Sequence, residues 1–358
     1  MKTLDAFRDL ADALAAAEAG GGPDGDEQRA HRLAAVLADS PQLHRVDPGL
    51  LLAELMADPR NWPDQSWKNY FGNACVTVVR TETLRVDVLY WLQNSSTLHK
   101  HVSAGAFLAL SGRRLHCEYD FAAADPLDSG VTFGALTATG RTMMRAASVS
   151  PILPTLVHEL YWIEKPSVTV SIRAVPRSQS EGADRHRPHE FIAPGAGYLP
   201  AAFQRTSNLQ RWIDGLGMLR LANRRLYLDT LERALPLVDP IHLIHVLDEL
   251  CDNPLDEVSA LLQRADAARS DDALARLAPA VPQFRRRKIF SRVQISGADG
   301  YLLAALLWSG AEGEELATLL KAEGVDEPGE FVRSRGERLI AVDPRTGPYV
   351  EQAGRSLR

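Results

Sequence analysis

The chain has 358 residues, of which 45% are hydrophobic and 24% are charged, and its formal net charge is −6. This composition is typical of a soluble globular protein with room for two domains, and the acidic balance does not favour nucleic acid as a partner. The three cysteines, Cys75, Cys117 and Cys251, stand far apart, so neither a disulfide framework nor a CxxC zinc site is predicted, and a cytoplasmic location fits. Residues 1–20 carry acids early, unlike a signal peptide, and no apolar run reaches the ~18 residues that cross a membrane.

Residues 1–63 are predicted to form an N-terminal helical cap. Residues 1–20 carry apolar side chains at helical spacing, and a glycine-rich break follows them. Two more helices are expected over Glu27–Ala38 and Pro48–Ala57. Asn61-Trp62-Pro63 ends this region.

Residues 64–180 change to an alternating pattern with many β-branched side chains. The strands are short, their turns contain Gly, Pro, Asp or Ser, and no helical stretch lies between them. The predicted strands are Cys75–Arg80, Leu84–Trp91, Ala106–Leu110, Arg114–Phe121, Val131–Thr137, Arg141–Val149, Thr155–Tyr161 and Ser167–Ala174. This pattern indicates a β-sandwich or a β-barrel.

Residues 181–200 are polar and are expected to form an exposed linker or lid. His186 and His189 lie in or beside an arginine-containing stretch, where histidines are solvated more often than they bind a metal. We therefore expect neither of them to be a ligand.

Residues 201–358 are predicted to form an all-α region, which makes the fold class α+β. Helices are expected at Leu209–Leu221, Arg224–Ala234, Pro240–Leu250 and Leu255–Ala267. His242 and His245 share a helix face without a carboxylate motif, so packing or surface roles are expected. From residue 284, a helix, a turn, a helix and a strand-like Arg338–Val342 resemble a degenerate winged helix. Its mixed charges favour packing or protein interaction over DNA binding.

His99 and His101 are the strongest candidates for a metal site. They stand two apart after a strand-like stretch, and the side chains at positions i and i+2 of a strand lie on one face. Neutral imidazole is the commonest side-chain ligand of mid-to-late transition metals. The alternative is that both histidines are ordinary polar residues of a loop.

A catalytic metal site needs a third protein ligand. His158 is the best candidate, because it lies in a later strand-like segment and distant strands of a barrel can lie side by side. His116 is the competitor, since its hairpin strand could present it to either face. The sequence does not decide which of Glu159, Tyr161 and Tyr119 orients the histidines. Tyr161 is taken as a candidate catalytic residue.

Five segments of the chain share features with one known family. They are Ser95–His101, Ala106–Gly112, Leu115–Phe121, Tyr70–Asn73 and Pro166–Pro176. The first three supply the histidine pair, a Phe-Leu-x-Leu strand with its glycine, and a closing aromatic residue. The last two fit a Tyr-x-Arg-Asn segment and the final core strand. Together they resemble the cysteine dioxygenase family of cupins, the thiol dioxygenases.

The resemblance covers residues 45–176, roughly a third of the chain. It implies a cupin-type β-barrel, also called a double-stranded β-helix. It also implies that His99, His101 and His158 bind one Fe(II) ion and leave positions for substrate and O2.

Several positions depart from the family pattern. Ordinary cupins carry a Glu ligand where this chain has Gly105 and Ala106, so a three-histidine site is implied. Ala106 matches the cysteine that crosslinks to a tyrosine in animal-type enzymes, and Arg173 stands at the tyrosine position. The family's substrate-binding arginine matches Gly72. Arg173 is therefore a candidate catalytic residue that binds an anionic group, and the alternative is an exposed arginine at a strand end.

The resemblance implies a mononuclear non-haem iron oxygenase acting on a thiol or an amino-acid derivative. The departures argue against free cysteine and favour a modified, peptide-linked or carrier-linked substrate. The helical region after Tyr198 is absent from minimal thiol dioxygenases, so it is expected to recognise a larger substrate or to form a homodimer interface. Two other hypotheses stay open: a non-catalytic cupin that senses or binds a ligand, and a cupin enzyme that uses another metal.

Overall fold

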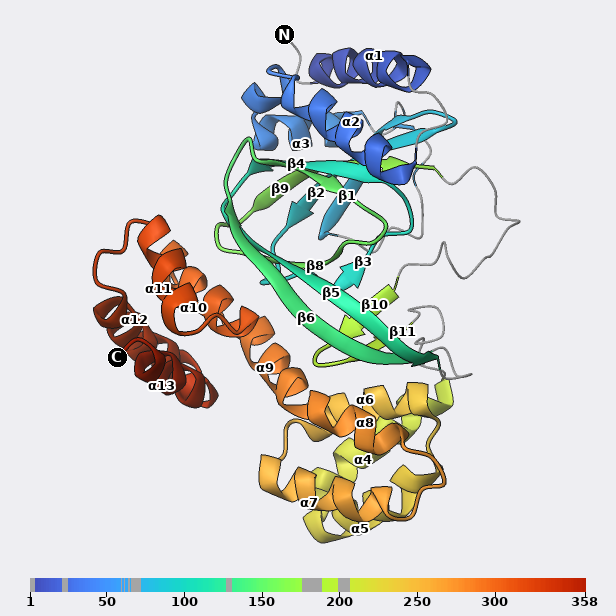
Figure 1. Ribbon diagram of the computed structural model, residues 1–358, viewed down its shortest axis with the longest axis vertical. Helices are drawn as coiled ribbons and strands as arrows, with labels where there is room; N and C mark the ends of the chain where they lie inside the picture. The colour runs from blue at the N-terminus through green and yellow to red at the C-terminus, as the bar shows by residue number, and fades with distance from the viewer. Residues whose placement is uncertain are drawn as a thin grey trace. The chain divides into compact units, whose positions relative to one another are not determined.

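The computed structural model describes residues 4–20, 25–58, 60, 62–63, 65, 72–126, 131–175, 189–198 and 207–358 (Figure 1). N-terminal helices, a β-barrel region and a C-terminal helical region follow one another, as the sequence predicts. None of the helices in the described ranges is long and apolar enough to cross a membrane. Tyr70 and His186, which the sequence singled out, lie outside the described residues.

Three helices begin the chain: α1 at Asp5–Gly20, α2 at Asp26–Ala38 and α3 at Pro48–Ala57. The sequence predicts all three. The Asp47 carboxylate caps α3 by accepting a hydrogen bond from the Leu50 backbone N–H at 2.8 Å. The apolar faces of the three helices pack against the outer face of one β-sheet and form a single hydrophobic cluster with it.

This first sheet is antiparallel and has the strand order β1-β2-β9-β4-β7. Its strands are β1 at Ala74–Arg80, β2 at Leu84–Trp91, β4 at Gly105–Ser111, β7 at Val149–Ile152 and β9 at Ser167–Ala174. Strands β2 and β9 pair over their full length, from Leu84 opposite Ala174 to Trp91 opposite Ser167. The predicted bounds of β2 and β9 are confirmed.

The second sheet has the strand order β10-β11-β6-β5-β8-β3. Its strands are β3 at His99–Lys100, β5 at Arg114–Pro126, β6 at Val131–Met144, β8 at Val157–Trp162, β10 at His189–Ile192 and β11 at Ala196–Tyr198. The predicted end of a strand at Thr137 is wrong, because β6 continues to Met144. The predicted strand Arg141–Val149 is interrupted by a turn, in which Ala147 has a φ of 70°.

The strand order identifies the type of barrel. If the eight strands from β2 to β9 are counted from one to eight, the sheets have the orders 1-8-3-6 and 2-7-4-5. This arrangement is that of two interleaved Greek keys, the jelly roll to which cupins belong. The region between the N-terminal and C-terminal helices is therefore a cupin-type β-barrel.

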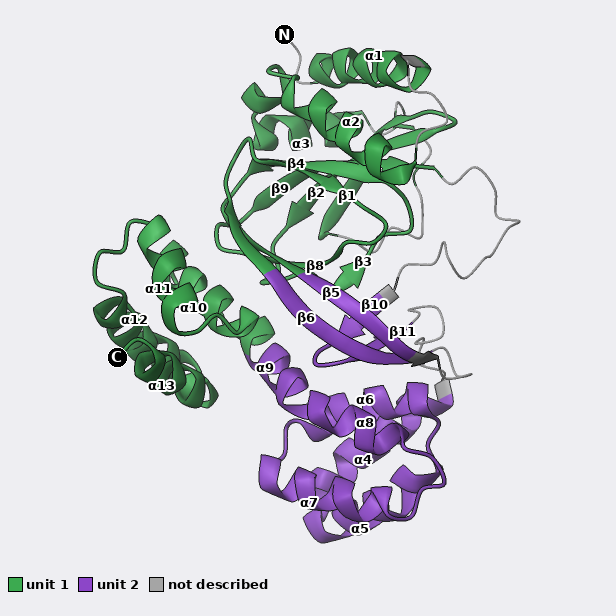
Figure 2. Ribbon diagram, in the orientation of Figure 1, with its two compact units in different colours: residues 1–118, 140–187, 290–358 green, residues 119–139, 188–289 purple. Residues whose placement is uncertain are grey.

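The chain divides into two compact units (Figure 2). Unit 1 comprises residues 1–118, 140–187 and 290–358, and unit 2 comprises residues 119–139 and 188–289. The helices of unit 2 are α4 at Ser207–Ala222, α5 at Arg224–Ala234, α6 at Pro240–Leu250, α7 at Leu255–Asp266, α8 at Ala273–Leu277 and the first part of α9 at Val281–Arg292. They share a hydrophobic core that includes Leu231, Leu247 and Phe284. The predicted bounds of α5 and α6 are confirmed.

Unit 1 ends with four helices: α10 at Ala298–Ser309, α11 at Gly313–Ala322, α12 at Pro328–Val342 and α13 at Gly347–Ser356. The predicted strand Arg338–Val342 is wrong, because this stretch ends α12. Residues 284–358 are all described, and they contain no strand that could serve as the wing of a winged helix. Helix α12 packs against α10 and α13 and buries Leu339, so tertiary packing overrides the local strand pattern.

Ion pairs join these last helices to the barrel within unit 1. The Glu323 carboxylate contacts the Arg113 and Arg145 guanidinium groups at 2.6 and 2.7 Å. Arg141 contacts Glu315 at 2.7 Å. The Glu323 side chain is 1% exposed, so its two charge-assisted hydrogen bonds replace the hydration that the carboxylate loses.

Candidate metal centre

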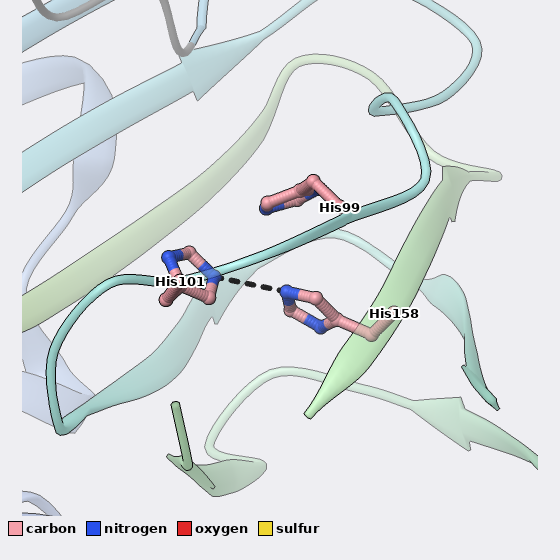
Figure 3. Close-up of side chains that lie close together, drawn as sticks. All are labelled: His99, His101 and His158. Carbon is pink, nitrogen blue, oxygen red and sulfur yellow. Dashed lines mark hydrogen bonds between the residues drawn. The ribbon is translucent and has the colours of Figure 1, made fainter. Parts of the chain in front are cut away.

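Three histidines meet on the inner face of the barrel (Figure 3). Strands β3 and β8 are antiparallel neighbours, and His99 lies directly opposite His158. His101 follows the end of β3. The ring nitrogens that the three side chains offer all lie within 4.8 Å of one another, and Nε2 of His101 is 2.9 Å from Nε2 of His158. The structure therefore brings together the three histidines that the sequence selects as a metal site.

Burial keeps these imidazoles neutral. His99 and His158 are buried and His101 is half-buried. Burial lowers the pKa of His99 to about 4, although its hydrogen bond to the Thr97 backbone opposes the shift. Burial likewise places the pKa of His101 and of His158 well below the usual value, and neighbouring histidines add to both shifts. A neutral imidazole has a lone pair to share, so all three side chains are in the form that a metal ion requires.

The second ring nitrogens of two of these histidines have defined partners. Nδ1 of His99 lies 2.7 Å from the Thr97 carbonyl oxygen, which can only accept a hydrogen bond. Nδ1 of His158 lies 2.8 Å from Nε2 of His116. These contacts leave Nε2 of His99 and of His158 as the nitrogens available to a metal. His116, the competing third ligand, stands behind His158 and is not a member of the three-histidine group.

Arg173 is the one charged residue of β9. Its charge lowers the pKa values of His99 and His101, which places it within electrostatic range of both rings. Burial is also the largest influence on the pKa of Arg173 itself, which is lowered. The neighbouring carboxylate, Asp87, is fully buried and pairs with Arg85 at 2.9 Å. Arg85 lies opposite Arg173 in the pairing of β2 with β9, so both arginines lie near this carboxylate.

The strand register places Ala106 and Arg173 on opposite faces of the first sheet. Arg173 lies opposite Gly105, whereas Ala106 lies opposite Ile172. Ala106 and Ile172 both belong to the hydrophobic cluster under the N-terminal helices. A side chain at position 106 therefore points away from the histidines, and Gly105 is the position that faces Arg173. A Cβ at Gly105 would lie 2.4 Å from the Ile172 carbonyl oxygen, so the close approach of the two strands requires glycine.

Gly72, the position that matches the family's substrate-binding arginine, lies just before β1. Its φ is 82°, in the left-handed region that favours glycine. An arginine at this position would strain the backbone.

Apolar side chains surround the inner face near the histidines. Phe107, Met144 and Ile152 form a small cluster, and the Phe107 ring centroid is 6.4 Å from that of His158. The Trp91 and Trp162 rings stack at 4.3 Å. These apolar side chains lower the local dielectric constant, which strengthens electrostatic interactions at the site.

The structure does not place Tyr161 with the histidines. Its hydroxyl donates a hydrogen bond to the Glu159 carboxylate at 2.8 Å, and its ring packs edge-on against Trp308 of α10 at 5.2 Å. Successive side chains of a strand point to opposite faces, so Tyr161, three residues after His158, lies on the outer face of β8. Tyr161 therefore does not lie with the three histidines, and its catalytic role stays a prediction.

The remaining candidate histidines form no second group in the described part of the chain. His242 lies 3.6 Å from Asp239 at the start of α6, and His245 is buried in the same helix. His189 begins β10. A packing role for His245 agrees with the prediction from the sequence.

Comparisons with known proteins were made on the sequence and on the structure. No model of a known protein family matches the sequence, and no curated protein matches it. Among solved structures, hydroquinone 1,2-dioxygenase from Sphingomonas sp. TTNP3 with 4-hydroxybenzoate bound is similar, with 14% identity and a TM-score of 0.23 over 31% of this chain and 70% of that chain.

Two cupin structures are also similar. An RmlC-like cupin from Shewanella frigidimarina has 9% identity and a TM-score of 0.22 over 33% of this chain and 94% of that chain. A cupin superfamily protein from Desulfitobacterium hafniense has 10% identity and a TM-score of 0.21 over 32% of this chain and 96% of that chain. At such values these likenesses carry no argument about activity, and the description of the barrel stands on its strand order.

Proposed function

We propose that this protein is a mononuclear non-haem iron oxygenase of the cupin type. The observation that carries the proposal is the group formed by His99, His101 and His158, three neutral imidazoles that converge inside the barrel. Imidazole suits iron, copper, nickel and zinc, so the donor set fits Fe(II) and does not by itself select it.

The separation of two of the nitrogens supports a shared ion. Two nitrogens that each lie about 2.1 Å from one ion, at a right angle, are about 3.0 Å apart. Nε2 of His101 and Nε2 of His158 share a hydrogen bond at 2.9 Å, and this distance matches the separation that a shared ion would require. When bound, the ion would supply redox chemistry toward O2 and a positive charge for a substrate anion. The resemblance to thiol dioxygenases is the reason for naming iron.

The substrate that we propose is a small anionic thiol or amino-acid derivative, free or linked to a peptide or carrier, and not cysteine itself. Three neutral ligands leave the full charge of the metal in place, which favours an anionic partner. Arg173 adds a second positive charge within electrostatic range of His99 and His101. A guanidinium binds a carboxylate through two parallel hydrogen bonds, so Arg173 would orient the substrate.

Metal analysis of the purified full-length protein tests the first part of this proposal. We expect one iron per chain in the wild type and loss of this iron in His158→Ala, because only two histidine ligands remain. The matched control is His242→Ala, which removes a half-buried histidine of α6. It should keep its iron.

Oxygen uptake tests the reaction. Uptake that depends on iron, on a small thiol and on His158 supports an oxygenase. Thiol binding without uptake would support a non-catalytic ligand-binding cupin instead. Turnover restored to the apo-protein by copper or nickel but not by iron would show another metal enzyme. A well-folded wild-type protein that takes up no metal contradicts the iron oxygenase and the enzyme that uses another metal.

A further inference from the structure

We propose that His116 is a positioning residue, which holds His158 in the one tautomer that can bind a metal through Nε2. This inference rests on the proposed metal site and assigns a role to a residue that is not a ligand. The observation is a line of polar groups that leads from the site toward solvent: His116 shares a hydrogen bond with His158, and the partly exposed Glu118 carboxylate lies 3.5 Å from the far nitrogen of His116.

The direction of the hydrogen bond between His116 and His158 follows from the charge beside His116. Nε2 of His116 and Nδ1 of His158 are 2.8 Å apart, so one nitrogen donates and the other accepts. The other nitrogen of His116, Nδ1, lies 3.5 Å from Oε1 of Glu118. An ionised carboxylate only accepts, so it favours a proton on Nδ1 of His116. Nε2 of the neutral His116 is then the acceptor, and Nδ1 of His158 carries the proton.

The position of this proton determines which nitrogen of His158 can bind a metal. A neutral imidazole carries one proton, so a proton on Nδ1 leaves the lone pair on Nε2. Nε2 is the atom that lies 2.9 Å from Nε2 of His101, inside the three-histidine group. The reverse direction would place the proton of His158 on Nε2, where it would occupy the position of the metal. The Thr97 carbonyl oxygen sets His99 in the same tautomer.

Water cannot take over the role of His116. Its side chain is 3% exposed, and the Phe107 ring packs edge-on against it with centroids 5.8 Å apart. A leucine in place of His116 would offer Nδ1 of His158 no acceptor. Glu118 is 44% exposed, so water can partly replace it, and its loss should have the smaller effect.

Variants at position 116 separate positioning from packing. In His116→Gln, the amide oxygen can reach the place of Nε2 and accept the hydrogen bond, whereas His116→Leu fills similar space without an acceptor. We expect Leu to weaken Zn2+ and Fe2+ binding about 10- to 100-fold, as loss of such supporting contacts usually does, and Gln to stay within about threefold of the wild type. The affinities are measured by competition with a chelator in full-length protein.

Two further variants serve as controls. Glu159→Gln changes the neighbour of His158 on the outer face of β8 and should leave metal affinity unchanged. Glu118→Gln removes the charge at the far end of the line and should weaken binding only severalfold. If His116→Leu binds metal as tightly as the wild type, the proposal is overturned.

The tautomer can also be read without a metal. Nitrogen-15 NMR of the histidine side chains in metal-free wild-type protein should show His158 protonated at Nδ1, and this signature should persist in His116→Gln and change in His116→Leu. A wild-type His158 protonated at Nε2 would overturn the proposal even if the protein binds iron. A wild type that binds no metal but shows the expected tautomer would overturn the proposed function alone.

Discussion

The two faces of strand β9 have opposite characters. Val168, Val170, Ile172 and Ala174 point outward and join the hydrophobic cluster of the N-terminal helices. Ser167, Thr169, Ser171 and Arg173 alternate with them and point into the barrel. The apolar core of this part of the protein therefore lies between the sheet and its helices. The inside of the barrel keeps the polar groups that the proposed chemistry uses.

The two faces of strand β8 also differ, but here the inner face carries apolar side chains and the outer face carries a polar pair. Its inner face carries His158 together with Leu160 and Trp162, which pack in an apolar cluster with Leu89 and Trp91. Its outer face carries a hydrogen-bonded pair, Glu159 and Tyr161, beneath α10. On both strands, the face on which a side chain lies determines whether it is near the three histidines.

Truncation of a large outward side chain on β9 should lower stability without changing metal binding. Ile172 is fully buried against the N-terminal helices, so Ile172→Ala should lower the free energy of unfolding by about 4 kcal/mol. Denaturant unfolding measures this loss. The folded variant should bind the wild-type amount of iron, and a loss of iron from folded protein would break the proposed separation of the two faces.

The buried histidines should make the metal-free protein sensitive to acid. Burial lowers the pKa of His99 to about 4. Between pH 6.5 and 4, His99 is therefore protonated in the unfolded chain and neutral in the folded chain. Stability is therefore full above pH 6.5 and falls as the pH drops toward 4, by on the order of 3 kcal/mol for this group. Unfolding measured across this range should show a smaller fall in His99→Asn.

The inward arginine should govern affinity for an anionic substrate and leave stability nearly unchanged. Arg173→Gln removes the charge, so a thiol that carries a carboxylate should bind about 30-fold more weakly, which is about 2 kcal/mol. Mercaptoacetate and its amide form a matched pair of ligands for calorimetry. Equal losses for the acid and the amide would show that Arg173 does not recognise the anionic group.

The outer face of β8 should contribute least to function. Tyr161→Phe removes one hydrogen bond to Glu159 and should cost about 1 kcal/mol of stability. Iron content and oxygen uptake should match those of the wild type. A large loss of turnover in this folded variant would support the predicted catalytic role of Tyr161.

Local patterns in the sequence predict much of the fold. The bounds of β2, β9, α5 and α6 follow from alternation and helical spacing, because each element buries one regular face. The three-histidine group also follows from the sequence, since the i, i+2 spacing and a strand-like setting for His158 are both local signals.

Features that depend on strand pairing could not be predicted in the same way. Which residue faces Arg173 depends on the register between β4 and β9, and a shift of one residue exchanges Gly105 for Ala106. The strand expected at Arg338–Val342 is helical, because neighbouring helices decide its environment. The contact between His116 and His158 joins two strands that no local pattern connects.

The contact between Arg113 and Glu323 has a consequence for the order in which the protein folds. The two residues are 210 positions apart, and unit 1 is assembled from three separate segments of the chain. Contacts of such long range are slow to form, because a large loop must close first. During synthesis, the barrel strands that carry the histidines emerge long before the helices that complete unit 1. Arg113 and Arg145 therefore cannot pair with Glu323 until residues 290–358 have been synthesised.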